Sequence, residues 1–388
     1  MVTTNEMHFD RGLDTTVIGE SDCSFIDGSA GVLEYVGYDI DSLARYSTFE
    51  ETAYLLLYKK MPTNSELDNF KKEINKFAII SEDVKKHLYA MNTNGEPMHV
   101  LRSLVSCLGA HDLSSYEPSA ESIDLDAVKQ DAIKLIAQMP ILLAGFDRIR
   151  QGQNLVEWNQ SHSIAWNFLN MRNGNPPTET MERAFDASLI LHAEHGFNAS
   201  TFTAVVTIST LSDLYSAVTA AIGALKGPLH GGANVRVMHM LQDIPSIEHV
   251  DEYINGKLSR GERVMGFGHR VYKSVDPRAT YLRGLAEKLA FDTGKEDLYK
   301  KSLRIVEIME KAVGSKGIHP NVDFFSATTY DSLGIKTDLF TPLFAMARVS
   351  GWAAHCLEQL SDNRLIRPRC EYTGPHGLEY VPIDQRSK

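Results

Sequence analysis

The chain has 388 residues, of which 43% are hydrophobic and 23% are charged, and its formal net charge is −11. This length exceeds what one hydrophobic core usually supports, so two domains or lobes are expected, and the acidic balance argues against nucleic acid as a partner. No apolar run reaches the ~20 residues of a membrane-spanning helix, and the N-terminal sequence has no basic-then-apolar signal pattern, so we expect a cytoplasmic protein without a membrane partner.

The four cysteines are Cys23, Cys107, Cys356 and Cys370, and no two of them form a C-x-x-C pair. Their wide separation argues against a disulfide framework and against a zinc ribbon. The pattern fits a reducing compartment, and no bound metal is expected.

The predicted elements begin with a hairpin. The segment SFIDGSAGVLEYVGY has apolar or aromatic residues on both sides of Asp27-Gly28, which is a hairpin signal. Beyond it, apolar residues recur at helical spacing. The main predicted helices are 47–61, 65–77, 98–112, 124–149, 214–227, 246–260, 279–292, 297–314 and 336–361.

Two details of these helices are also predicted. Ser47 and Glu50 have the spacing of a capping box at a helix start, and Pro140 should interrupt the helix at 124–149. No alternation of strands and helices appears along the chain. The fold class is therefore mainly α with a minor β element.

Two segments pair a histidine with crowded glycines. GPLHGGAN contains His230, and MGFGHRVYK contains His269. Glycine lets backbone approach a ligand closely, and a histidine there can donate hydrogen bonds or transfer protons near neutral pH. The two segments are interpreted as two walls of one pocket, although a single His-Gly pair is more often a turn or a helix end.

The second of these segments lies in a basic stretch. Residues 257–278 contain six Lys or Arg and two acidic residues, which indicates a discrete anionic ligand; for 257–263 alone, a solvated helix face explains the charges equally well. GFGHRV lacks the third glycine of a dinucleotide-binding loop and follows no predicted strand, so a dehydrogenase is disfavoured.

The sequence HAEH at 192–195 has two histidines three residues apart. Zinc-binding helices usually separate their histidines by four residues and add a third ligand, so a metal site is disfavoured. His195, near a predicted helix end, is interpreted as a group that binds a polar ligand, and His192 as a core histidine.

Two charged residues lie in apolar surroundings. Asp323 stands between Val322 and Phe324, where partial desolvation would raise its pKa and make it a better base; the alternative is an N-cap for a helix that begins at Phe324. Arg348 lies in the apolar segment FAMARVSGWAAHC. It either pairs with a buried acid or faces a polar pocket.

Taken together, these motifs resemble the citrate synthase family over nearly the whole chain. GPLHGGAN, MGFGHRVYK-x-x-DPRA and NVDFFSA occur in the family's order, and HAEHGFNAST, FTPLFAMARVSGWAAH and RLIRPR are similar to its short bacterial and archaeal form. The resemblance implies a homodimer of mostly helical, two-domain subunits with no permanently bound cofactor. The large domain would comprise 1–227 and 336–388 and the small domain 228–335, and a C-terminal arm would reach the neighbouring subunit.

The resemblance also assigns the chemistry to three residues. Asp323 would remove a methyl proton from acetyl-CoA while His230 donates a hydrogen bond to the thioester oxygen. His269 would polarise and then protonate the ketone of oxaloacetate as the new C–C bond forms. The citryl-CoA would be hydrolysed in the same site, which makes the protein an acyltransferase that releases citrate and CoA.

Further residues are implied in substrate binding. The oxaloacetate-binding residues would be His195, Arg278, Arg348 and, from the other subunit, Arg367. The CoA-binding residues would be Met265, Gly266, Phe267 and Gly268 through their backbone, and Lys273 through a phosphate.

Three alternatives remain open at this point. A 2-methylcitrate synthase would use propionyl-CoA through the same residues, because one methylene in an acyl pocket is worth only ~1–3 kcal/mol of discrimination. A catalytically silent CoA- or polyanion-binding protein would keep the pocket without turnover. A metal-dependent hydrolase would use HAEH.

Overall fold

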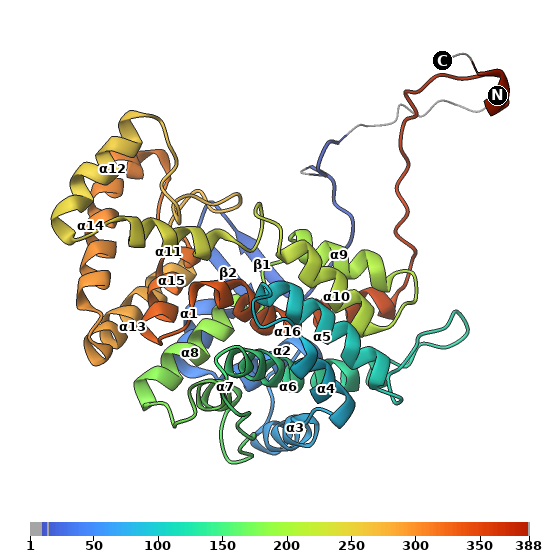
Figure 1. Ribbon diagram of the computed structural model, residues 1–388, viewed down its shortest axis with the longest axis horizontal. Coiled ribbons are helices and arrows are strands. Elements are labelled where there is room, and N and C mark those ends of the chain that lie inside the picture. The colour runs from blue at the N-terminus through green and yellow to red at the C-terminus, as the bar shows by residue number, and fades with distance from the viewer. Residues whose placement is uncertain (1–9, 14, 387–388) are drawn as a thin grey trace.

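The computed structural model describes residues 10–13 and 15–386, and helices make up most of it (Figure 1). Its one sheet within these residues has three antiparallel strands in the order β1 (Ser24–Asp27), β2 (Val32–Tyr35) and β3 (Tyr38–Asp39). The Asp27 carboxylate accepts the backbone N–H groups of Ser29 and Ala30 in the first turn. The predicted hairpin is confirmed.

Sixteen α-helices follow within the described residues, which confirms the mainly α fold class. The first ten are α1 (Ile40–Tyr46), α2 (Phe49–Tyr58), α3 (Asn64–Phe77), α4 (Glu82–Ala90), α5 (Pro97–His111), α6 (Leu125–Ile149), α7 (Ile164–Asn173), α8 (Glu179–His192), α9 (Ala199–Ile208) and α10 (Leu214–Leu225). The last six are α11 (Ala233–Asp243), α12 (Val250–Ser259), α13 (Pro277–Thr293), α14 (Glu296–Val313), α15 (Val322–Ser332) and α16 (Phe340–Ser361).

Helix α16 is the centre of the core. It packs against α6, α9, α10, α2 and α8, and its residues are buried along nearly its whole length. A helix that is apolar on all sides must be surrounded by others. The apolar composition of 340–361 therefore explains its central position.

The prediction that Pro140 interrupts a helix is wrong. Helix α6 runs continuously for 25 residues with Pro140 inside it. Proline removes one backbone hydrogen bond and crowds the preceding turn. Residues around it, including Met139 and Leu142, are fully buried, so tertiary packing offsets that local cost.

The predicted capping box at Ser47 and Glu50 is also wrong, by one residue. Thr48 is the N-cap of α2 and accepts the backbone N–H of Glu51, while the Ser47 hydroxyl donates to the Glu51 carboxylate. Glu50 is buried and accepts the backbone N–H of Ile164 instead. A long-range partner thus replaces the local one.

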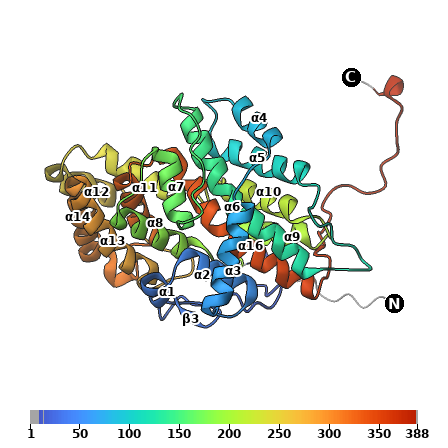
Figure 2. The ribbon, with the colours of Figure 1, turned by 90° about the horizontal axis from the view of Figure 1, so that it is seen from below.

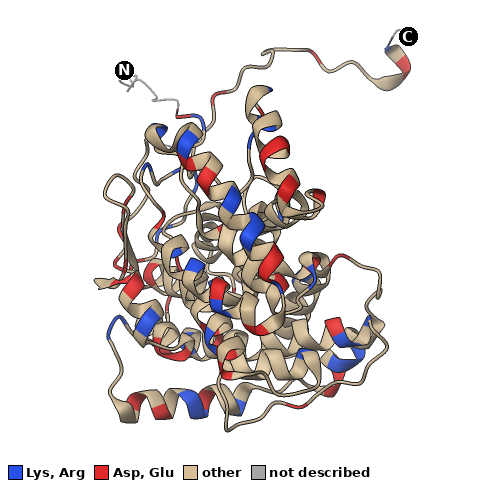
Figure 3. Ribbon diagram, turned by 90° about the vertical axis from the view of Figure 1, so that its left-hand side faces the viewer, with Lys and Arg blue, Asp and Glu red and all other residues tan. Residues whose placement is uncertain are grey.

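Helices α11 to α15 gather at one end of the molecule in both ribbon views (Figures 1 and 2). Helix α13 joins this group to the rest by packing against α8 and α1. Basic and acidic residues are interspersed along the ribbon at this end (Figure 3). One ion pair, Arg304 of α14 with Asp251 of α12, holds two of its helices together at 2.5 Å.

The C-terminal segment 362–386 leaves the body as an extended arm (Figures 1 and 2). Its only regular element is a short 3-10 turn, Ile383–Gln385, and most of its residues are exposed. Among residues 10–13 and 15–386, none of the helices has the length and apolar content needed to cross a bilayer.

Candidate active site

The glycine loop at 265–268 is attached to the start of α15. The Gly268 N–H donates to the His319 carbonyl at 2.9 Å, and the Asn321 N–H donates to the Gly266 carbonyl at 2.9 Å. The Asn321 side-chain amide also donates to the Gly268 carbonyl at 2.9 Å. Because Asn321 is the N-cap of α15, these bonds hold the loop that leads to His269 beside the turn that carries Asp323.

Glycine is required at position 266 for two reasons. Its φ of +80° lies in the left-handed region, and an added Cβ would stand 2.8 Å from side-chain atoms of Phe324 and Val237. A side chain there would be strained and would also collide with the core. The loop therefore lies directly on α15 and α11.

The backbone fixes the tautomer of His269. Its Nδ1 atom accepts the N–H groups of Val271 at 3.0 Å and Tyr272 at 3.2 Å. Burial, with the Arg278 charge, lowers the pKa of His269 to about 4, so the ring is neutral at pH 7. A neutral ring whose Nδ1 accepts carries its proton on Nε2, which is left as a donor.

His195 lies beside His269, with ring centroids 5.3 Å apart. Its Nε2 atom is 3.1 Å from the hydroxyl oxygen of Tyr272. Burial lowers the pKa of His195 well below its ordinary value, and the Arg278 charge adds to the effect. Tyr272 was missed by the sequence analysis, although it stands within the HRVYK motif; an aromatic residue there carries no sign of its polar contact.

His230 is held by the start of α9. Its Nε2 atom accepts the Ser200 N–H at 3.3 Å and lies 2.8 Å from the Ser200 hydroxyl. The buried Trp352 indole N–H donates to that hydroxyl at 3.1 Å. Burial lowers the pKa of His230 to about 4. Because a backbone N–H can only donate, Nε2 is the acceptor, and the proton of the neutral ring is on Nδ1.

Asp323 lies in the first turn of α15 and is not its N-cap, because Asn321 has that role. The N-cap alternative is therefore wrong. Burial raises the pKa of Asp323 to about 6, and the positive charge of Arg278 only partly opposes this effect. Within the described residues, its carboxylate accepts no hydrogen bond from a protein group. It is a desolvated, unpaired carboxylate, as the apolar flanks predict.

Arg278 is positioned by Asp276. The guanidinium donates to both carboxylate oxygens, from Nε at 3.0 Å and from Nη2 at 2.9 Å, and both side chains are nearly inaccessible to solvent. The same carboxylate accepts the backbone N–H of Val322. This pair joins the start of α13 to the start of α15 and leaves Nη1 of Arg278 free of protein acceptors within the described chain.

Arg348 is buried in α16 and does not pair directly with an acid. Its Nε donates to the His192 carbonyl at 2.7 Å, and its guanidinium lies 4.7 Å from the centre of the Phe344 ring. Burial lowers the pKa of Arg348 to about 10. Both Nη atoms lack a protein acceptor among the described residues, and a buried cation of this kind requires an anionic partner.

Two predicted binding residues lie apart from this group. Arg367 is exposed on the C-terminal arm, which points away from the body of its own chain (Figure 1). Lys273 is exposed near the glycine loop, where its ammonium donates to the Arg270 carbonyl at 3.2 Å.

His192 is a core residue, as predicted. It has no exposed surface, its Nδ1 lies 2.7 Å from the Ser188 carbonyl, and burial lowers its pKa to about 3. Its ring packs against Phe344 and Tyr330. His195 makes its contacts with Tyr272 and His269 instead, so the two histidines of HAEH do not form a chelating pair.

The fold and site define a mainly helical protein in which neutral histidines, buried arginines and one desolvated carboxylate lie close together. Residues 12–369 match the sequence profile of the citrate synthase C-terminal domain. The chain is 47% identical over 378 residues to citrate synthase 2 of Bacillus subtilis, covering 97% of this chain and 99% of that protein. It is 39% identical over 376 residues to a 2-methylcitrate synthase of Shewanella oneidensis, covering 97% of each.

A solved structure is similar over the same extent. It is the ternary complex of carboxymethyl coenzyme A and oxaloacetate with citrate synthase from Thermoplasma acidophilum, with a TM-score of 0.89, 35% identity, and coverage of 97% of this chain and 98% of that one. The chain therefore belongs to the citrate synthase family, as its motifs predicted.

Proposed function

We propose that this chain is a citrate synthase, which condenses acetyl-CoA with oxaloacetate and hydrolyses citryl-CoA to citrate and CoA without a permanently bound cofactor. The observation that carries the proposal is the combination of one desolvated carboxylate with two neutral histidines of fixed tautomer. A weakly acidic thioester can be deprotonated only where a base and hydrogen-bond donors act together. This set of side chains supplies both.

Asp323 is the base in this proposal. With a pKa of about 6 it is mainly ionised at pH 7, yet it binds a proton more strongly than an ordinary carboxylate. Those are the properties needed to accept a methyl proton from acetyl-CoA. His230 donates from Nδ1 to the thioester oxygen, where negative charge develops, and one such donor contributes about 3–4 kcal/mol.

His269 acts on the second substrate. Its Nε2–H donates to the ketone oxygen of oxaloacetate and makes the carbonyl carbon more electrophilic. As the enolate carbon forms the new C–C bond, the ketone oxygen takes that proton. Water then attacks the thioester carbon of citryl-CoA and the C–S bond breaks. The proton held by Asp323 passes to the leaving sulfur, so that CoA leaves as the thiol; one water proton restores His269, and the other is lost to solvent as the new carboxylate ionises.

Oxaloacetate is a dianion, and the buried arginines suit it. Among the described residues, Arg278 and Arg348 each keep guanidinium N–H groups without a protein acceptor, and His195 offers a further polar contact. Arginine binds carboxylates through paired N–H groups. Arg367 would complete the set from a second copy of the chain, because its own arm extends away from the site. This requires a homodimer.

For CoA, the backbone of Met265, Gly266, Phe267 and Gly268 would contact the adenine, and Lys273 would bind a phosphate. The carbonyls of Gly266 and Gly268 and the Gly268 N–H already bond to residues 319 and 321, so the proposed adenine contact would use the other backbone polar groups of this loop.

Arg278 and Asp323 belong to α13 and α15, at the end of the molecule formed by α11 to α15 (Figure 1), whereas Arg348 belongs to α16. We assign 228–335 as a small domain and 1–227 with 336–388 as a large one. His230, His269 and Asp323 all lie within 228–335, whereas His195 and Arg348 lie outside it. Substrates bound among these residues would therefore contact both domains.

The function is tested by thiol release from acetyl-CoA with and without oxaloacetate, with propionyl-CoA in parallel. We expect release that depends on oxaloacetate, favours acetyl-CoA and is unaffected by a chelator. A preference for propionyl-CoA would place the chain with the 2-methylcitrate synthases. Absence of release from either thioester would leave a binding protein and refute the catalytic assignments.

A further inference from the structure

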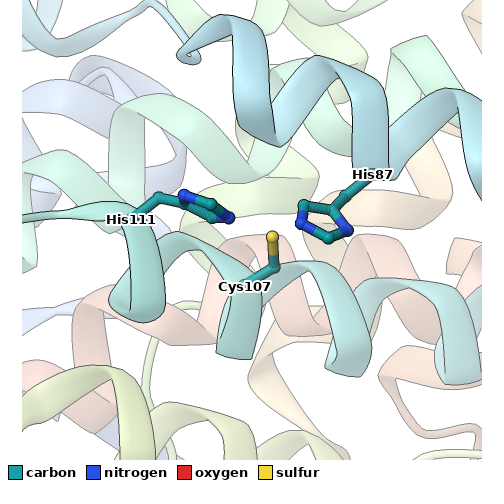
Figure 4. A group of neighbouring side chains, drawn as sticks. All are labelled: His87, Cys107 and His111. Atoms are coloured by element: carbon teal, nitrogen blue, oxygen red, sulfur yellow. The ribbon is translucent and has the colours of Figure 1, made fainter.

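A group of potential metal ligands lies outside the site described above, where α4 meets α5. Cys107 and His111 belong to α5, and His87 belongs to the last turn of α4. Figure 4 shows the two imidazole rings on either side of the Cys107 sulfur. The possible ligand atoms of the three residues all lie within 4.8 Å of one another. We propose that His87, Cys107 and His111 form a zinc-binding site.

The helices explain why these side chains converge. Residues four apart on a helix lie on the same face, so Cys107 and His111 project side by side from α5. Helix α4 packs on α5 and brings His87 to the same place. Neither a pair of cysteines nor a pair of histidines signals this group in the sequence, because it combines a mixed Cys–His pair with a histidine from a second helix.

The His87 and His111 imidazoles act electrostatically on the Asp83 carboxylate, whose pKa they help to lower. Within the described residues, neither ring makes a hydrogen bond to a protein group, and the ring centroids are 5.2 Å apart at a tilt of 46°. His87 is exposed, so its ring can turn without disturbing the core. One nitrogen from each of the two imidazoles and the sulfur of Cys107 are therefore available as three metal ligands.

The spacing suits zinc after a small adjustment. Zinc binds thiolate sulfur at about 2.3 Å and imidazole nitrogen at about 2.0–2.1 Å in tetrahedral geometry, which places ligand atoms roughly 3.3–3.6 Å apart. A spacing of up to 4.8 Å therefore needs a contraction of at most about 1.2–1.5 Å, which side-chain rotation can supply. One thiolate and two imidazoles are ligands that zinc favours, and water would occupy the fourth position.

A second group, Cys23, His355 and Glu358, has similar spacing but does not support a metal site. The Lys59 ammonium lies 2.7 Å from the Cys23 sulfur and 2.8 Å from the Glu358 carboxylate. His355 pairs with the carboxylates of Glu358 and Glu194. A cation of the protein already occupies this position.

Zinc at the proposed site would join the C-terminal turns of α4 and α5. The site shares no residue with the proposed catalytic group, so zinc is not expected to be needed for turnover. The proposal does not depend on the catalytic assignments.

The test uses the full-length protein, freed of metal and kept reduced. Zinc affinity is measured by competition with a chromophoric chelator, and Co²⁺ is added separately to detect thiolate-to-cobalt absorption. We expect one zinc per chain and a thiolate–cobalt band. His111→Ala or Cys107→Ser should weaken zinc binding by more than about 100-fold, because loss of a residue that merely orients a ligand already costs about 10–100-fold.

Matched variants keep the result interpretable. His99→Ala removes an exposed histidine of the same helix, and Cys370→Ser removes an exposed thiol of the arm; both should bind zinc like the unaltered chain. His111→Cys supplies a replacement ligand and should retain Co²⁺ with stronger thiolate absorption. Unchanged zinc affinity in His111→Ala and Cys107→Ser, or no zinc binding by the unaltered chain, would overturn the proposal.

Discussion

The protonation state of each proposed catalytic residue follows from its immediate partners. Two backbone N–H groups turn Nδ1 of His269 into an acceptor, and the Ser200 N–H does the same for Nε2 of His230. Burial then keeps both rings neutral and Asp323 more basic than usual. The three side chains thus meet substrates as two donors and one base.

Asp323→Asn should remove turnover and leave oxaloacetate binding largely intact. The amide has nearly the same shape but cannot accept the proton, and a positioned base contributes about 10²–10⁴-fold to rate. Steady-state thiol release gives kcat, and calorimetry gives oxaloacetate affinity. Asp331→Asn is the control, because Asp331 lies on the same helix and pairs with Lys295 at 3.1 Å. An active Asp323→Asn enzyme would refute the assigned base.

The pH dependence of kcat/KM should report the same carboxylate. Asp323 accepts a proton only when ionised, and burial raises its pKa to about 6, so activity should be full above that value and fall about tenfold per unit below it. His230 and His269, with pKa values of about 4, stay neutral over this range. A profile that is flat down to pH 5 would contradict this account.

The glycine loop and α15 act as one structural unit. Hydrogen bonds from Asn321 and to His319 hold the loop against the N-terminus of the helix, and the Asp276–Arg278 pair adds the start of α13 through Val322. Asp323 and His269, 54 residues apart in the chain, are oriented by the same short contacts. Disturbing the loop should therefore affect both stability and catalysis.

Gly266→Ala tests this unit. A non-glycine residue in the left-handed region costs about 1–2 kcal/mol, and the collision with Phe324 and Val237 adds about 1–3 kcal/mol of overpacking. Gly261→Ala is the matched control, because Gly261 has a φ of +69° but no atom within 4 Å of an added Cβ. The midpoint of chemical denaturation should fall further for Gly266→Ala. Equal shifts of the denaturation midpoint in the two variants would mean that the structure relieves the crowding at Gly266 without loss of stability.

At the scale of the whole molecule, one proposed substrate-binding residue, Arg367, does not reach the site of its own chain. The arm at 362–386 extends away from the body (Figures 1 and 2) and exposes apolar side chains such as Leu365 and Tyr380. Exposed apolar surface of this kind is typical of an interaction segment. This is the basis for placing Arg367 in the site of a second copy.

Mixing two inactive variants tests that placement. If the chain forms the proposed homodimer, Arg367→Ala and Asp323→Asn should each have little activity by themselves. When their subunits are exchanged at equal amounts, half of the dimers are mixed and each of these holds one intact site, so activity should recover to about a quarter of that of the unaltered enzyme. No recovery after demonstrated subunit exchange would mean that Arg367 acts in the site of its own chain, and full activity of Arg367→Ala alone would mean that Arg367 has no role.

Much of the fold could be predicted because helices and tight turns depend on the spacing of apolar residues over short stretches of sequence. Apolar spacing, together with proline and glycine as helix-breaking residues, predicts the turn after Asp27 and most of the helices. The two local errors, at Pro140 and Glu50, arose where distant contacts outweighed local preference: core packing around α6, and the Ile164 amide.

For the site, the motifs and their resemblance to a family named the residues, and the apolar flanks of Asp323 indicated its raised pKa. Other features could be identified only in the folded chain. They are the tautomers of His230 and His269, the ion pair of Arg278 with Asp276, the contact of Tyr272 with His195, and the proximity of His87 to Cys107. Each depends on the distance and direction between specific atoms. Composition and periodicity indicate which face of an element is buried, but only packing determines which polar atoms meet there.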